Sequence, residues 1–173
     1  MLRLLPCLLW VLLSLGSNAH TGTETEITVH LAPGRTLLVV RCAPELAWKL
    51  LGPEAPSGPL DSAVSSAQPQ LENLASQLVE LRIEEKTLLP DRIRVLLEPD
   101  RHLAFALTFL QSGAPTLLSL PYLANLHPRE PAILEFFDHS TSRRPAKPFA
   151  RIEVQNPDRL VEFTPTSAHA LIP

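Results

Sequence analysis

Asp138, His139 and Ser140 are the residue types of a hydrolytic triad, in which a serine attacks, a histidine accepts its proton and a carboxylate orients the histidine. Here the three are consecutive, and neighbours along a chain seldom meet in that geometry. The sequence also has no Gly-x-Ser-x-Gly motif, which places a nucleophilic serine on a tight turn. We therefore expect no hydrolase site, and the protein is predicted not to be an enzyme.

Metal and cofactor motifs are also missing from the sequence. The six histidines are scattered, and neither a His-x-x-x-His pair nor a Cys-x-x-Cys pair is present. With six glycines in the whole chain, a glycine-rich phosphate loop is hard to build. The sequence predicts no metal site and no cofactor.

The amino-terminal residues have the layout of a secretory signal peptide. Arg3 precedes a leucine-rich run at residues 4–15, and small residues at 17–19 precede His20. Crossing a bilayer takes roughly 20 apolar residues, more than this run supplies. We predict a cleaved signal peptide at 1–19, a secreted, extracellular product and no membrane anchor.

Cys42 is then the only cysteine, because Cys7 leaves with the signal peptide. An odd cysteine in a secreted protein indicates an inter-chain disulfide, and so a homodimer, or a free thiol. A buried cysteine that packs as a small apolar side chain is the alternative. The sequence leaves both open.

Four basic residues form a candidate glycan-binding patch: Arg143, Arg144, Lys147 and Arg151. A solvated loop is the ordinary alternative. Pro145 follows the dibasic pair directly, which makes proteolytic processing there unfavourable. The formal net charge of −3 is too small to indicate a nucleic-acid partner or an acidic membrane surface.

Short alternating runs predict a mainly β fold, either β-sandwich-like or α+β. Residues 25–31 alternate between apolar and polar, Pro33-Gly34 predicts a turn, and residues 35–42 form a second, more apolar strand. Residues 46–51 continue as a third short strand or a single helical turn. These elements belong to one predicted domain at 20–163.

A Pro/Ser-rich segment at 52–69 has the composition of a mobile loop. It is followed by leucines at positions 71, 74, 78 and 81, whose spacing predicts one amphipathic helix packed on the sheet.

The second half of the chain continues the strand pattern. Pro-Asp-Arg turns at 90–92 and 99–101 frame a predicted hairpin, and residues 114–131 are expected to stay extended or looped because of their prolines. Two more strands are predicted at 132–137 and 149–155, with Phe149, Ile152 and Val154 in the core. The tail at 164–173 is predicted to be flexible.

Residues 26–54, EITVHLAPGRTLLVVRCAPELAWKLLGPE, resemble the repeated orphan-domain strands of the endoglin and betaglycan co-receptors. In that family a hydrophobic strand is followed by a turn and a strand with a tryptophan before aliphatic residues, and Trp48 stands at the tryptophan position. The similarity extends over roughly residues 26–98. Unlike the family's receptors, this chain has no anchor, no Asn-x-Ser/Thr site and no second cysteine in the secreted part.

The resemblance implies a β-rich domain that presents growth factors of the transforming growth factor β superfamily. The leading hypothesis is thus a secreted, non-enzymatic, co-receptor-like protein that binds such a growth factor. An exposed apolar strand edge would be its docking element, with Leu37, Val39, Trp48 and Leu50 as candidate contacts. The alternative is a secreted signalling ligand or cytokine that presents the helix near residues 71–81 to a receptor.

Overall fold

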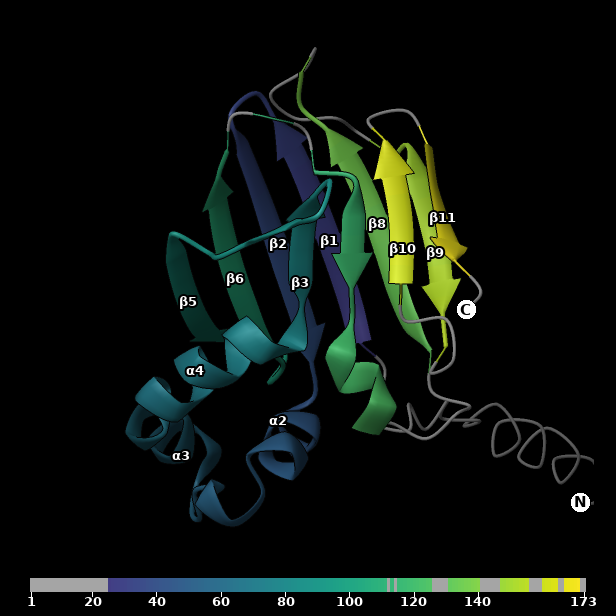
Figure 1. Cartoon of the computed structure of the whole chain (residues 1–173). Helices are drawn as coiled ribbons and strands as arrows, with labels where there is room; N and C mark the ends of the chain where they lie inside the picture. Colours follow the sequence, from purple (N-terminus) through teal and green to yellow (C-terminus); the bar gives the residue numbers. More distant parts are fainter. Residues whose placement is uncertain are drawn as a thin grey trace, which may run out of the picture.

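The computed structural model describes residues 25–111, 113, 115–125, 131–140, 147–155, 160–164 and 167–171. Within these ranges the chain folds into two β-sheets that face each other, with three α-helices gathered at one end (Figure 1). The predicted α+β, sandwich-like class is therefore confirmed. The predicted signal peptide at 1–19 lies outside the described residues. None of the described helices is long and apolar enough to cross a membrane.

The larger sheet is built around the predicted first hairpin. Strands β1 (Thr25–Ala32) and β2 (Arg35–Cys42) pair antiparallel along their whole length. Gly34 has a φ of 71°, a left-handed conformation that glycine adopts without steric cost, so Pro33-Gly34 makes the tight turn. The alternating residues of β1 are fully buried or partly exposed, as the sequence pattern predicted.

Four more strands complete the six-stranded sheet, in the order β5-β6-β2-β1-β8-β9. They are β5 (Arg92–Leu97), β6 (Leu103–Leu110), β8 (Ala132–Asp138) and β9 (Ala150–Val154). The predicted β5–β6 hairpin is confirmed. β8 pairs parallel with β1, which brings two segments more than a hundred residues apart side by side. Both edges of β2 are thus occupied, by β1 and by β6.

The smaller sheet has five strands in the order β11-β10-β7-β3-β4. They are β3 (Glu80–Ile83), β4 (Lys86–Leu88), β7 (Leu117–Ser119), β10 (Leu160–Thr164) and β11 (Ser167–Leu171). β11 pairs with β10, so the prediction of a flexible tail at 164–173 was wrong for residues 167–171. A strand at the end of a chain is ordered when it can complete its hydrogen bonds on a neighbour, and β10 offers that edge.

Helices occupy the segment that composition had marked as a loop. A 3₁₀ turn, η1 (Gly52–Glu54), is followed by α3 (Leu60–Ser66) and α4 (Gln68–Leu78). The prediction of a loop at 52–69 was wrong for residues 60–69 because Ala63, Val64 and Ala67 recur at helical spacing and are buried, although their small neighbours mask the pattern. A second 3₁₀ segment, η2 (Pro121–Asn125), lies beside α4.

Residues 46–51 also proved helical, as part of α2 (Pro44–Leu51). Pro44 follows β2 directly after Ala43, and its fixed φ suits the first turn of a helix. Glu45 in the first turn and Lys49 in the last complement the helix dipole. Gly52 ends the helix at a φ of 59°.

The predicted amphipathic helix is α4, and its apolar side faces the protein interior. The helix ends at Leu78, so the prediction was wrong for Leu81, which lies on β3. Leu71, Leu74, Ala75 and Leu78 are buried, whereas Asn73, Ser76 and Gln77 are exposed. α4 packs against β5, α2 and η2 and so closes the lower end of the sandwich. An apolar stripe used in this way is not available to a receptor.

The core lies between the two sheets. Phe136 on β8 contacts Phe163 on β10 with ring centroids 5.1 Å apart and Phe149 at 6.0 Å. Of the predicted core residues at 149–155, Val154 is fully buried, while Phe149 and Ile152 are partly buried against the core. Phe136 therefore links the two sheets.

Candidate functional site

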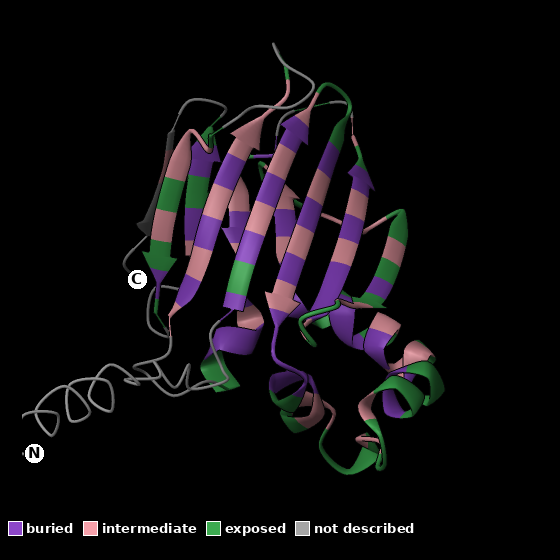
Figure 2. Cartoon of the chain, turned by 180° about the vertical axis from the view of Figure 1, so that it is seen from behind, coloured by how far each residue is buried: buried purple, intermediate pink, exposed green. Residues whose placement is uncertain are grey.

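The outer side of the six-stranded sheet is left uncovered by the described helices and strands (Figure 2). Figure 2 looks onto this side, and the helices lie below the sheet rather than across it. We call it the outer face. Its centre consists of Thr28, Leu37, Val39, Ala106, Thr108 and Phe137, all of them partly exposed.

The register makes five of these residues neighbours across β1, β2 and β6, whereas on β8 Glu135 is opposite Thr28 and Phe137 is opposite His30. Val39 is opposite Ala106 on β6 and Thr28 on β1, and Leu37 is opposite Thr108. The solvent-exposed face of an antiparallel sheet usually carries polar side chains. The centre of the outer face instead carries aliphatic, aromatic and threonine side chains, a composition typical of a surface that contacts another molecule.

Charged residues frame this apolar centre on both sides. On β5, Arg92 and Arg94 are exposed and have no ion-pair partner among the described residues. On the opposite side, Arg151 of β9 lies 3.7 Å from Glu135 of β8. The frame therefore carries unpaired positive charge at its β5 side.

The predicted contact residues fall in two separate places. Leu37 and Val39 lie in the centre of the outer face, but the expectation of an exposed edge was wrong, because β2 is paired on both sides. Trp48 and Leu50 lie on α2 at the helical end, and the region predicted as one strand is thus a strand and a helix. Trp48 lines a separate hollow of about 560 Å³ with Arg101 and His102.

Cys42 points into the core at the end of β2 and is 2% exposed. Burial, with a smaller contribution from Glu45, raises the pKa of its thiol to about 12. An inter-chain disulfide requires the sulfur to reach a second molecule, which a buried side chain cannot do without local unfolding. Of the two alternatives that the sequence left open, the structure favours the buried thiol.

This position predicts that Cys42 reacts slowly. Because the thiolate is the reactive form, we expect negligible alkylation of the native protein at pH 8 and complete alkylation in denaturant. Mass spectrometry after timed exposure to iodoacetamide measures both. Rapid native labelling, or a reducible dimer on a gel, would show that Cys42 is accessible.

The predicted basic patch is only partly described. Arg143 and Arg144 lie outside the described residues. Lys147 is exposed, and Arg151 is exposed on β9 beside Glu135. The glycan-binding hypothesis therefore stays a prediction.

The three residues of the triad motif are not assembled as a triad. The Ser140 hydroxyl donates to Asp138 Oδ2 at 2.8 Å, whereas His139 faces His30, with its Nε2 atom 3.0 Å from His30 Nδ1. The Ser140 N–H, also 2.8 Å from Asp138, is the main cause of a lowered pKa for that carboxyl. Among the described residues, Ser140 thus has no histidine positioned to take its proton.

His30 and His139 form a pair on the outer face that the sequence did not reveal. The His30 ring also stacks on Phe137, with centroids 5.0 Å apart and planes 20° apart. Burial, and to a lesser extent the neighbouring His139, lowers the pKa of His30. The alternation along β1 predicted that His30 lies on the exposed side of the strand. Only the parallel pairing of β1 with β8 brings His139 next to it.

A second cluster missed by the sequence surrounds Arg41. Its Nε donates to Glu98 at 2.6 Å, Nη1 donates to Glu26 at 2.7 Å, and Nη2 donates to Asp100. The hydrogen bond with Glu98 is the main cause of a raised pKa for the guanidinium. This network ties β1 and β2 to the β5–β6 turn, so it is structural.

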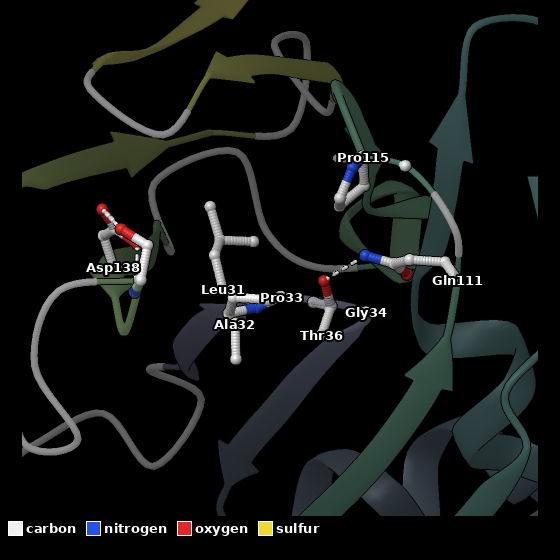
Figure 3. A pocket seen from close by; sticks show the side chains of 10 residues that line it. Leu31, Ala32, Pro33, Gly34, Thr36, Gln111, Pro115 and Asp138 are labelled. Carbon is white, nitrogen blue, oxygen red and sulfur yellow. Dashed lines mark hydrogen bonds between the residues drawn. The ribbon is translucent and has the colours of Figure 1, made fainter.

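A hollow of about 380 Å³ opens at the upper end of the sandwich, beside the β1–β2 turn (Figure 3). Leu31, Ala32 and Pro33 line it on one side, and Gln111 donates to the Thr36 hydroxyl at 2.7 Å on the other. Its described lining combines apolar side chains with hydroxyl and amide groups that already bond one another. The hollow has room for a small ligand, and Asp138 and Ser140, whose hydroxyl donates to the Asp138 carboxylate, also line it. No histidine is among its described lining residues.

The chain matches no family model and no curated protein sequence.

Proposed function

We propose that this protein is a secreted, non-enzymatic binding protein whose outer face binds a growth factor of the transforming growth factor β superfamily. The observation that carries the proposal is the apolar centre of the outer face, around Leu37 and Val39, left open by the described elements. The choice of growth factor rests on the resemblance of residues 26–98 to the endoglin and betaglycan orphan domains.

The outer face has the composition and the backbone order that a protein-binding surface needs. Interfaces commonly combine an apolar centre with a charged rim, and the outer face has both. The side chains at its centre extend from paired strands, so little backbone order is lost on binding. Leu37 and Val39 thus act together with residues of β1, β6 and β8 rather than as an isolated strand.

The charged residues that border the apolar centre also indicate the chemistry of the partner. Arg92 and Arg94 are exposed at the β5 side without ion-pair partners among the described residues. Arginine pairs well with carboxylates because its planar donors match both oxygens. We infer a partner with an apolar patch bordered by acidic residues on the side that meets β5.

The experiment is surface plasmon resonance of the secreted protein against a panel of dimeric growth factors of this superfamily. Val39→Arg places a long cation in the centre of the outer face. We expect it to weaken binding by about 10- to 100-fold, or about 1.4–2.8 kcal/mol. Arg94→Glu should mainly slow association and reduce its salt dependence.

Ser76→Arg on the exposed side of α4 is the matched control, because it adds the same charge away from the outer face. It should leave the affinity unchanged, and circular dichroism should show that both variants fold. Binding that persists in Val39→Arg would place the contact elsewhere. A panel in which no growth factor binds the native protein would refute the proposed partner.

A further inference from the structure

We propose that His30 and His139 form a binding site for a divalent transition-metal ion of the zinc type at the upper part of the outer face. This inference is independent of the proposed function. It rests on the position of two imidazole rings that the parallel β1–β8 pairing brings together: His30 lies on β1, and His139 directly follows β8.

The spacing of the two rings fits chelation. His30 Nδ1 and His139 Nε2 are 3.0 Å apart, and the ring centroids are 5.2 Å apart. With metal–nitrogen distances of about 2.0 Å, two nitrogens lie about 3.3 Å apart in a tetrahedral site and about 2.8 Å apart in a square-planar one. The centroids of two such imidazoles in a tetrahedral site lie about 5.1 Å apart. The rings therefore need only pivot, without moving their centres, to direct both lone pairs at one ion.

The His30 ring and the His139 backbone are positioned before any metal arrives. Phe137 stacks on His30, and the backbone N–H of His139 donates to the Leu31 carbonyl at 2.7 Å. A site that is already ordered loses little conformational freedom on binding. The two ligands come from different parts of the chain, His30 on β1 and His139 just after β8, so only the folded protein brings them together.

Space for the remaining ligands is present in front of the rings. The two histidines line a hollow of about 520 Å³ together with Ala32, Arg35 and Leu37. Among the described residues, no group of three His, Cys, Asp or Glu side chains gathers around a point. With two ligands from the described residues, we expect water or a small anion to complete the coordination. Arg35, a cation in the same hollow, favours an anion in one of these positions.

A neutral imidazole pair that shares one N–H also accounts for a 3.0 Å contact, so metal titration decides between the two. The secreted protein, stripped with a chelator, is titrated with ZnCl₂ and separately with CuSO₄ by isothermal calorimetry. We expect one equivalent of Zn²⁺ to bind, and Cu²⁺ to bind more tightly by the usual order of divalent ions.

Single substitutions His30→Gln and His139→Gln should each abolish this binding. His102→Gln, at a histidine of the β5–β6 turn, should leave it intact. In the native protein, Zn²⁺ should shift the ring resonances of His30 and His139, a readout that does not depend on the variants folding. Absence of binding, or binding that survives both substitutions, would overturn the proposal.

Discussion

Replacing Phe136 with alanine is expected to lower the free energy of unfolding by about 3–5 kcal/mol, the range for truncating a buried phenylalanine. Phe136 is fully buried and its ring meets Phe163 of the other sheet and Phe149. Its removal leaves a cavity at the point where the sheets are joined. Since a domain of ordinary size is stable by about 5–15 kcal/mol, this single change removes a large share. Urea unfolding followed by fluorescence measures it.

Phe137→Ala is the matched control, because the same truncation is made one residue along β8 on the opposite face of the sheet. Phe137 is partly exposed and stacks on His30. Loss of one exposed aromatic contact costs about 1 kcal/mol. Equal losses for the two variants would contradict the assignment of inner and outer faces, on which the proposed binding surface depends.

The second large effect is expected at the helical end of the sandwich. Leu71→Ala in α4 should lower the free energy of unfolding by about 2–5 kcal/mol, because the side chain is fully buried where α4 meets the six-stranded sheet. Alanine keeps the helix intact, so the loss reports packing rather than helix propensity. The same urea titration measures it.

Leu89→Ala is the control for that measurement. Leu89 is 83% exposed, so its truncation should change stability by about 0.5 kcal/mol or less. If Leu71→Ala were equally mild, α4 would not be anchored to the sandwich. In that case its apolar side would be free for a partner, as the signalling-ligand hypothesis requires.

Substitutions on the outer face and substitutions in the core should affect different quantities, binding affinity in the first case and stability in the second. Val39 and Phe137 point outward, whereas Phe136 and Leu71 point inward. Substitutions on the outer face should therefore change affinity while the unfolding midpoint moves little.

The local elements of this protein were largely determined by its sequence. The alternation in residues 25–31, the Pro33-Gly34 turn and the hairpin framed by two Pro-Asp-Arg turns all predicted what the structure contains. The α4 helix followed from leucines at helical spacing. Such signals are local because side-chain periodicity and turn chemistry act over a few residues. Where small residues masked the periodicity, at α3, the prediction of a loop was wrong, and at α2 the sequence left a strand and a helical turn open.

The neighbours of each strand were decided only by the tertiary structure. Alternation tells that a strand has two faces, but not which distant strand will pair with it. The parallel pairing of β1 with β8 creates the His30–His139 pair, and β2 becomes an interior strand because β1 and β6 flank it. For the same reason the sequence could not say that Cys42 is buried or that Leu37 and Val39 share a face with Phe137. Those relations arise from packing between segments that are far apart in the chain.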